Sequence, residues 1–203
     1  MNDNESPAND GNIEIPYRRL HIFGASGSGT TTLGRALGQR LPHEVLDSDD
    51  YFWARKFDEA RPPEDRVREL ANDLDGHERW LLSGAICGWG DSFRPRFDFV
   101  VFLHVPAEER LARLRAREEK RYGEDVLPGG SMYEQSQAFL EWAALYDHAG
   151  EEVRSLKLHE QWMSELTCPI LRIEGLHSVE ERVETVLKAM RAESDREGAK
   201  RQS

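Results

Sequence analysis

The sequence predicts an α/β protein built on a parallel β-sheet with helices on both faces. Short apolar runs typical of buried strands recur along the chain, and helical patterns separate one run from the next. Such alternation favours a doubly wound sheet of three layers, because each helix returns the chain for another parallel strand. A length of 203 residues fits one domain.

Five apolar runs are the expected strands. They lie at residues 18–24, 43–47, 79–84, 97–105 and 168–175. Four helices are expected between and after them, for instance where apolar residues recur every three or four positions. These helices cover residues 30–41, 63–75, 107–121 and 179–191.

The connection between the fourth and fifth expected strands is longer than a simple crossover. It extends from about residue 118 to 166 and holds two helical stretches, 131–146 and 151–166, separated by Gly150. Inserted helices of this kind often close over a ligand, so we expect a helical lid.

Composition sets the limits of the domain and excludes several classes of partner. Residues 1–16 and 192–203 are small and charged, which predicts disordered tails around an ordered domain at 17–191. A net charge of -11 argues against nucleic-acid binding, and no apolar run approaches the roughly 20 residues of a membrane span. The polar, acidic start is unlike a signal peptide, so we expect a cytoplasmic protein that binds neither nucleic acid nor membrane.

Residues 24–32, GASGSGTTT, have the spacing of a phosphate-binding loop between a strand and a helix. Gly24, Gly29 and Thr31 fit the pattern G-x-x-x-x-G-K-[ST], but Thr30 occupies the lysine position. Glycines allow successive backbone N–H groups to surround an anion at the positive end of the following helix. The backbone part of such a site survives the loss of the lysine, whereas the cation that reaches the β- and γ-phosphates is missing.

We therefore expect the loop to bind a nucleotide. Thr31 stands where a hydroxyl ligates Mg²⁺ in such loops, and Thr32 can cap the helix or contact the α-phosphate. Either another cation replaces the lysine or phosphoryl transfer is slow. The residues expected to contact the nucleotide are Gly24, Ser26, Gly27, Ser28, Gly29, Thr30, Thr31 and Thr32.

Two other interpretations of the glycine-rich segment remain open. It can be a tight turn before a helix, or the dinucleotide loop of an NAD(P)-binding reductase. A reductase loop of the G-x-x-x-G-x-G type would need glycines where Ser28 and Thr30 stand, and no tyrosine of this chain has a lysine four positions later. Asp47 or Asp49 could still bind the ribose of a dinucleotide.

Two further segments carry a family resemblance. VLDSDD (45–50) resembles the D-[ST]-D that ends the second strand of shikimate-kinase-like enzymes, and residues 98–117 resemble a fourth strand followed by an arginine-bearing lid helix. With the loop, they make residues 18–191 similar to the P-loop kinase group that includes adenylate and other nucleoside monophosphate kinases, shikimate kinase and gluconate kinase. The resemblance implies the strand order 2-3-1-4-5, ATP and Mg²⁺ as cofactors and a small-molecule acceptor. The third-strand substrate motifs of the group are not matched by SGAICGWGD (83–91), so the acceptor's identity does not follow.

Asp47 and Asp49 end the second expected strand and should face the phosphate loop. By resemblance, Asp47 is assigned to the metal and Asp49 to the substrate or to proton transfer. A solvated acidic turn is the alternative.

Arginines are the expected replacements for the lysine. Arg113, Arg117 and Arg121 share one face of their expected helix, and guanidinium groups bind phosphates at two points. In the insert, a closing lid can bring Arg154 or Lys157 onto the γ-phosphate. Exposed arginines paired with neighbouring glutamates, and an ordinary amphipathic helix, are the respective alternatives.

The sequence thus favours a kinase that transfers the γ-phosphoryl group of ATP to a nucleoside monophosphate or another small metabolite, as a monomer or homodimer. Asp49, Arg117, Arg121 and Arg154 are the predicted catalytic residues, Thr31 and Asp47 the metal ligands, and Arg113 a nucleotide ligand. Gly84 and Trp89 follow the third expected strand, where Trp89 can stack on a substrate ring or the segment can be a flexible connection. A nucleotide-binding module without efficient transfer, acting through a partner, is the second candidate.

Overall fold

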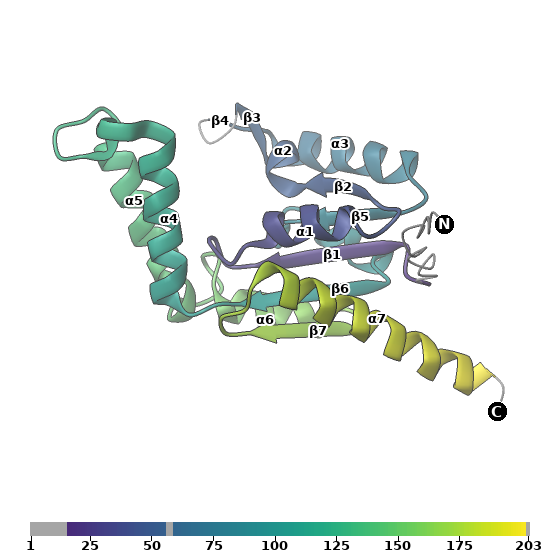
Figure 1. Cartoon of the computed structure of the whole chain (residues 1–203). Helices are drawn as coiled ribbons and strands as arrows, with labels where there is room; N and C mark the ends of the chain where they lie inside the picture. Colours follow the sequence, from purple (N-terminus) through teal and green to yellow (C-terminus); the bar gives the residue numbers. More distant parts are fainter. Residues whose placement is uncertain (1–15, 56–58, 202–203) are drawn as a thin grey trace, which may run out of the picture.

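Five parallel strands form the central sheet in the order β2-β5-β1-β6-β7 (Figure 1). This order confirms the predicted 2-3-1-4-5 arrangement. The strands are β1 (Arg19–Gly24), β2 (Glu44–Asp47), β5 (Trp80–Ser83), β6 (Phe99–His104) and β7 (Ile170–Glu174). The computed structural model describes residues 16–55 and 59–201, with the backbone alone for 194–201.

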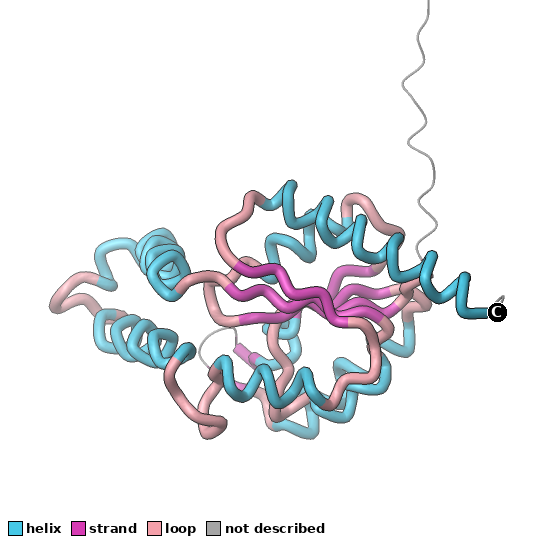
Figure 2. Tube along the Cα trace, turned by 90° about the horizontal axis from the view of Figure 1, so that it is seen from below, coloured by secondary structure: helices cyan, strands magenta, loops and turns pink. Residues whose placement is uncertain are grey.

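Helices cover both faces of the sheet (Figure 2). On one face, α1 (Thr30–Gly38) and α7 (Val179–Arg201) bury Leu33 and Val186 in one apolar cluster with β1 and β6. On the other, α3 (Pro63–Gly76) and α6 (Leu156–Ser164) bury Leu70 and Trp162 in a second cluster. None of the helices in the described ranges is long and apolar enough to cross a membrane.

Two further helices project from the sheet as a hairpin (Figure 1). They are α4 (Ala107–Tyr122) and α5 (Tyr133–Ala144), followed by the short 3-10 helices η2 (Gly123–Val126) and η3 (Leu145–Asp147) respectively. Leu114 and Leu140 pack between α4 and α5 in a small apolar cluster of their own. At the base of the hairpin, the fully buried Arg110 donates from Nε to the Val105 carbonyl and from a terminal nitrogen to Asp147.

Three short elements between β2 and α3 were not predicted. Asp47 caps α2 (Ser48–Phe52), because its Oδ1 accepts from the Asp49 N–H at 3.1 Å. The antiparallel pair β3 (Trp53–Arg55) and β4 (Glu59–Ala60) follows, and η1 (Asp91–Arg96) lies after β5. All are too short to give a periodic pattern in the sequence.

The insert and the C-terminal segment differ from the sequence-based expectation. Within 118–166, only α4 and α5 project, whereas α6 buries Trp162 against the sheet and belongs to the core. The helix expected at 151–166 begins at Leu156, because Ser155 Oγ accepts from the Leu158 N–H at 3.0 Å and caps it.

The tail expected from residue 192 continues α7 to Arg201 instead, since extending a packed helix needs only local hydrogen bonds. The N-terminal tail expected at 1–16 lies outside the described residues except for Pro16.

The sheet register brings the carboxyl ends of three strands together. Asp47 of β2 is paired with Ser83 of β5, which in turn is paired with Ile22 of β1. The loop after β1, the acidic segment after β2 and the glycine after β5 therefore meet at one edge, where ligands bind in open α/β sheets.

Candidate active site

The loop between β1 and α1 has the backbone conformation that its glycines permit. Gly27 and Gly29 have φ angles of 81° and 94°, in the left-handed region that other residues rarely adopt. A Cβ on Gly27 would lie 2.7 Å from the Arg110 carbonyl oxygen, so this position admits glycine alone. Gly29 is also the N-cap of α1, which places the free N–H groups of the helix start beside the loop.

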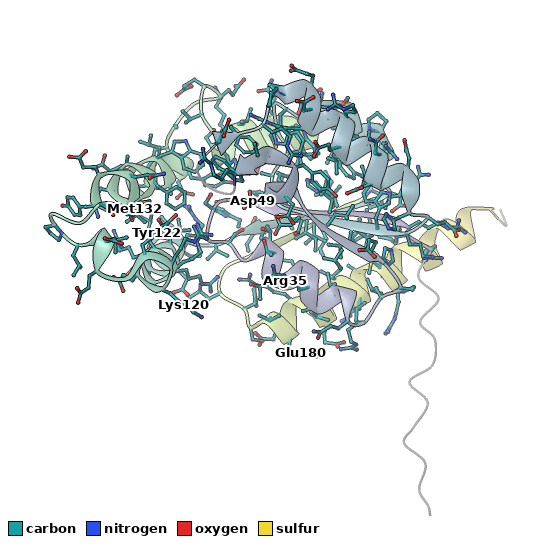
Figure 3. The ribbon with its side chains drawn as sticks, turned by 90° about the horizontal axis from the view of Figure 1, so that it is seen from above. Arg35, Asp49, Lys120, Tyr122, Met132 and Glu180 are labelled. Atoms are coloured by element: carbon teal, nitrogen blue, oxygen red, sulfur yellow. The ribbon has the colours of Figure 1, made fainter. Side chains whose placement is uncertain are left out.

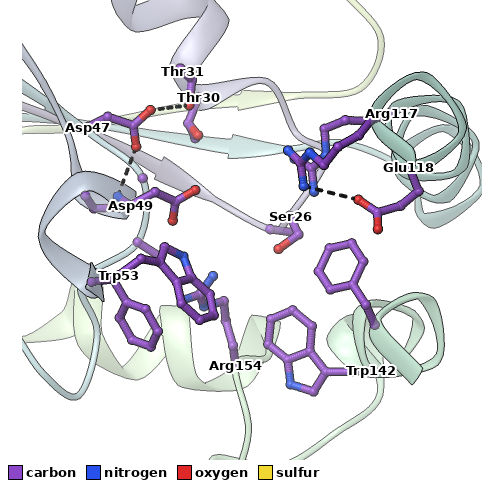
Figure 4. Close-up of a pocket in the computed structure, with 18 of the residues that line it drawn as sticks. Ser26, Thr30, Thr31, Asp47, Asp49, Trp53, Arg117, Glu118, Trp142 and Arg154 are labelled. Atoms are coloured by element: carbon purple, nitrogen blue, oxygen red, sulfur yellow. Dashed lines mark hydrogen bonds and ion pairs between the residues drawn. The ribbon is translucent and has the colours of Figure 1, made fainter. Parts of the chain in front are cut away.

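A cavity of about 410 Å³ opens between the loop, α2 and the projecting hairpin (Figure 4). Asp49 lies at the edge of the sheet that faces the end of α4, at Tyr122, and the start of α5, which Met132 precedes (Figure 3). The sequence-predicted site residues that line the cavity are Gly24, Ser26, Gly27, Thr30, Thr31, Asp47, Asp49, Arg117, Arg121 and Arg154.

Thr31 and Asp47 form a pair of oxygen donors at the inner end of the cavity. Thr31 Oγ1 donates to Asp47 Oδ2 at 3.0 Å (Figure 4). A hydroxyl and a carboxylate suit a hard cation such as Mg²⁺, which completes its shell with phosphate and water oxygens. The described part of the chain contains no group of three or more His, Cys, Asp or Glu side chains that could hold a metal ion.

Three arginines reach the cavity from the hairpin side. Arg117 and Arg121 come from α4, and Arg154 precedes α6. Within residues 16–55 and 59–193, Arg117 and Arg154 form no hydrogen bond or ion pair, and Arg154 lies over the Trp142 ring at 5.6 Å. Arg121 pairs with Glu118 at 3.4 Å.

The electrostatics of Arg117 reflect this concentration of positive charge. Loss of water and the neighbouring Arg121 lower the pKa of Arg117, while the negative charges of Glu118 and Asp49 act in the opposite direction. An anion placed among the arginines would relieve their mutual repulsion.

The arginines expected along one face of α4 lie in three different environments. Arg110 is buried at the base of the hairpin, and Arg113 pairs with Glu109 at 2.9 Å and approaches the Gly27 carbonyl at 3.5 Å. Arg113 therefore lies behind the loop and does not line the cavity. The predicted nucleotide contacts Ser28, Gly29 and Thr32 do not line it either. Lys157 is also absent from the lining, because it is exposed and pairs with Glu151 at 3.1 Å.

Arg182 of α7 supports the loop, although sequence reasoning gave it no role. It is 4% exposed and donates to the Ser28 carbonyl at 2.8 Å. Its guanidinium lies 3.3 Å from where a Cβ on Gly29 would be. Burial and, next, the charge of Arg113 lower the pKa of Arg182. No local signal could reveal this contact, because the two residues are 154 positions apart.

The segment after β5 contributes backbone rather than an aromatic ring. Gly84 lines the cavity with a φ of 95°, and a Cβ there would lie 2.1 Å from Ser48 Oγ. Trp89 packs against the core, with its ring 6.4 Å from that of Phe52, and does not line the cavity. Burial raises the pKa of the Cys87 thiol to about 12, so it is no nucleophile at neutral pH.

Aromatic rings line the cavity in place of Trp89. Phe52 and Trp53 come from the end of α2 and the start of β3, and Phe139 and Trp142 come from α5. Sequence reasoning missed all four, because the segments that carry them come together only in the folded chain.

Comparisons with known sequences give the family of the chain. A profile of the AAA domain family matches residues 21–138. YqaC of Bacillus subtilis, an uncharacterised protein, is 58% identical over 170 residues, which are 84% of this chain and 96% of YqaC. Shikimate kinase of Aliivibrio salmonicida is 33% identical over 119 residues, which are 51% of this chain and 67% of that enzyme.

Solved structures share the fold. Shikimate kinase from Acinetobacter baumannii, in complex with shikimate, aligns with 88% of this chain and 96% of its own at a TM-score of 0.54 and 20% identity. A gluconokinase from Sinorhizobium meliloti 1021 aligns with 90% of this chain and 97% of its own, at a TM-score of 0.53 and 17% identity. The family match shows that the chain belongs to the AAA domain family, and the match to shikimate kinase shows that it is a P-loop small-molecule kinase and hence a phosphotransferase.

Proposed function

We propose that this phosphotransferase transfers the γ-phosphoryl group of ATP, with Mg²⁺, to a nucleoside monophosphate or another small metabolite. The observation that carries the proposal is the meeting of three features in one cavity: the glycine loop, the Thr31–Asp47 oxygen pair at 3.0 Å, and two arginines, Arg117 and Arg154, that pair with no carboxylate among the described residues. Transfer of a phosphoryl group depends mainly on positioning and charge, which these features supply.

The loop side of the cavity suits the polyphosphate. The N–H groups at the start of α1 and around Gly27 provide donors for phosphate oxygens. Thr31 and Asp47 would hold Mg²⁺, which neutralises charge on the β- and γ-phosphates when bound. Arg182 and Arg113 fix the outer side of the loop through its carbonyls.

The missing lysine is replaced by arginines in this proposal. Arg117 and Arg154 line the cavity from two different segments and can each offer two parallel N–H donors to a phosphate. Arg121 is partly neutralised by Glu118, so it is assigned a weaker role.

Asp49 is assigned to the acceptor. Its carboxylate lines the cavity two residues after Asp47, and its backbone N–H is engaged by the Asp47 side chain. A carboxylate in this place can accept the proton of an attacking hydroxyl or orient it.

A second candidate is a nucleotide-binding module without efficient transfer. The observation in its favour is Thr30 itself, which lines the cavity but offers a hydroxyl instead of a cation. Titration calorimetry with Mg²⁺-ATP, combined with ADP release in the presence of nucleoside monophosphates, polyols and sugar acids, separates the two. Turnover supports the kinase, tight binding without turnover on any acceptor supports the module, and no binding of any nucleoside triphosphate contradicts both.

The oligomeric state, the location and the partner of the protein complete the proposal. We retain a monomer or homodimer, a cytoplasmic location, and a small-molecule acceptor as its main partner. Light scattering on the purified protein measures the oligomeric state directly.

A further inference from the structure

The half of the cavity away from the loop has two aromatic walls. Phe52 and Trp53 form one, with ring centroids 4.9 Å apart, and Phe139 and Trp142 form the other, with centroids 6.0 Å apart. Figure 4 shows Trp53 and Trp142 on two sides of the space below Ser26. The four side chains are half-buried, so part of each ring remains available to a ligand.

Arginines accompany these rings. Arg154 lies over the Trp142 ring at 5.6 Å, and Arg117 lies over the Phe139 ring at 5.7 Å. Such stacking holds a guanidinium plane in place while its N–H groups stay free for an anion. This half of the cavity therefore combines flat apolar surfaces with two positioned cations.

Few neutral hydrogen-bonding groups are present in the same half. Apart from the serines and threonines of the loop, α1 and α2, the described lining residues carry one amide, Gln135, one phenol hydroxyl, Tyr122, and the indole N–H groups of the two tryptophans. A polyhydroxylated, ring-free acceptor needs many such partners, because each hydroxyl that loses water without a partner costs free energy.

We infer that the phosphate acceptor carries a flat aromatic or heteroaromatic ring together with an anionic group, the chemistry found in a nucleoside monophosphate. This inference rests on the proposed kinase function and specifies its acceptor. The ring stacks between the walls of Trp53 and Trp142. One of the two arginines, Arg154 or Arg117, binds the anion, and the other stays with the phosphates of ATP. Because Asp49 and Trp53 belong to one short segment, α2 and the start of β3, the aromatic wall lies on the acceptor side of the metal pair.

Acceptor binding can be measured without turnover. The probes are AMP, CMP, GMP and UMP. Adenosine is the comparison compound that lacks the anion, and ribose 5-phosphate is the one that lacks the flat ring. Shikimate and gluconate are anions without an aromatic ring. Each is titrated into the full chain in the presence of Mg²⁺-ADP, with tryptophan fluorescence as the readout, and each is also tested for phosphorylation by ATP. We expect at least one nucleoside monophosphate to bind about tenfold more tightly than every comparison compound.

Substitutions of the walls provide the second arm. Trp53→Ala and Trp142→Ala should each raise the dissociation constant of the bound monophosphate about tenfold, whereas Trp53→Phe and Trp142→Phe, which keep a ring, should stay within about threefold. The dissociation constant of Mg²⁺-ATP should change less than about twofold in all four. Thermal melting of each variant shows whether it is folded, and the phenylalanine variants keep the test valid if an alanine variant is not.

The outcomes separate this inference from the kinase function. If shikimate or gluconate is phosphorylated while no flat-ring anion binds, the inference is wrong and the kinase stands. If a monophosphate binds between the tryptophans but is never phosphorylated, the cavity's preference for a flat-ring anion stands, whereas its role as an acceptor site and the kinase function both fail. An effect of the alanine variants on ATP instead of the monophosphate would assign the walls to the adenine ring and overturn the inference.

Discussion

Thr31 Oγ1 donates to Asp47 Oδ2 at 3.0 Å, which joins the first turn of α1 to the last residue of β2. The fold itself holds the two groups next to each other. A cation arriving with a nucleotide therefore meets two oxygen ligands at little cost of rearrangement.

Asp47→Asn should impair magnesium use more than folding. The amide oxygen can still cap α2, but the negative charge that holds the cation is lost. We expect kcat/KM to fall about a hundredfold and the magnesium concentration for half-maximal rate to rise. Asp50→Asn is the matched control, because Asp50 is exposed and does not line the cavity. Equal losses in both variants would contradict the assignment.

Arg117→Ala and Arg154→Ala should each lower kcat/KM about tenfold or more, because each removes a cation that lines the cavity. Initial rates at varied ATP concentration measure this. Lys157→Ala should leave the rate unchanged, since Lys157 is exposed and pairs with Glu151. A loss in Lys157→Ala without a loss in either arginine variant would show that the lysine replacement lies elsewhere.

Thr30→Lys tests whether the arginines do the work of the missing lysine. Thr30 lines the cavity, so a lysine there directs its ammonium toward the same phosphates. In the Arg117→Ala variant, we expect the added Thr30→Lys substitution to raise the rate at least about tenfold. In the unsubstituted enzyme, the same substitution should change the rate less. Additive effects of the two substitutions would mean that the two cations are independent.

Arg182→Met should loosen the phosphate loop. The apolar stem is kept, but the hydrogen bond to the Ser28 carbonyl is lost from a site that is 4% exposed. We expect the free energy of unfolding to drop by about 2 kcal/mol and the KM for ATP to rise. Arg191→Met on the exposed side of α7 is the control. An unchanged KM with lowered stability would limit Arg182 to a packing role.

Two buried histidines should make the fold sensitive to mild acid. Burial lowers the pKa of His21 from 6.5 to about 4, and that of His159 from 6.5 to about 3. Both stay neutral in the folded protein, whereas the unfolded chain binds protons below pH 6.5. Stability is therefore complete above pH 6.5 and falls toward pH 4 by about 1.4 kcal/mol per pH unit for each histidine.

Urea unfolding between pH 7.5 and pH 5 checks this expectation. His159→Gln keeps a partner for the Tyr146 hydroxyl, which His159 Nδ1 contacts at 2.8 Å, but does not titrate. Below pH 6.5 its stability should fall less steeply than that of the natural chain, by about 1.4 kcal/mol per pH unit, in line with one histidine fewer. A flat profile for the natural chain would show that water reaches these rings.

The sequence was sufficient for the features that are encoded locally. The strand runs, the glycine loop and the pair Thr31 and Asp47 follow from short patterns, since each depends on neighbours along the chain. The aromatic walls depend on α2 and α5 meeting across the cavity, and the support of Ser28 by Arg182 spans 154 positions. Helical spacing placed the α4 arginines on one face, but it could not show that this face passes from a buried base, past the loop, to open solvent.

The contact between Arg110 and Asp147 joins the first turn of α4 to the end of η3. The two chain segments at the base of the hairpin are therefore held together at one point. If the hairpin closes over the cavity, as we predict, we expect α4 and α5 to swing together about this contact. The far end of the hairpin travels furthest, which makes Tyr122 and Met132, near the tip, the places where a distance label would register closure most clearly.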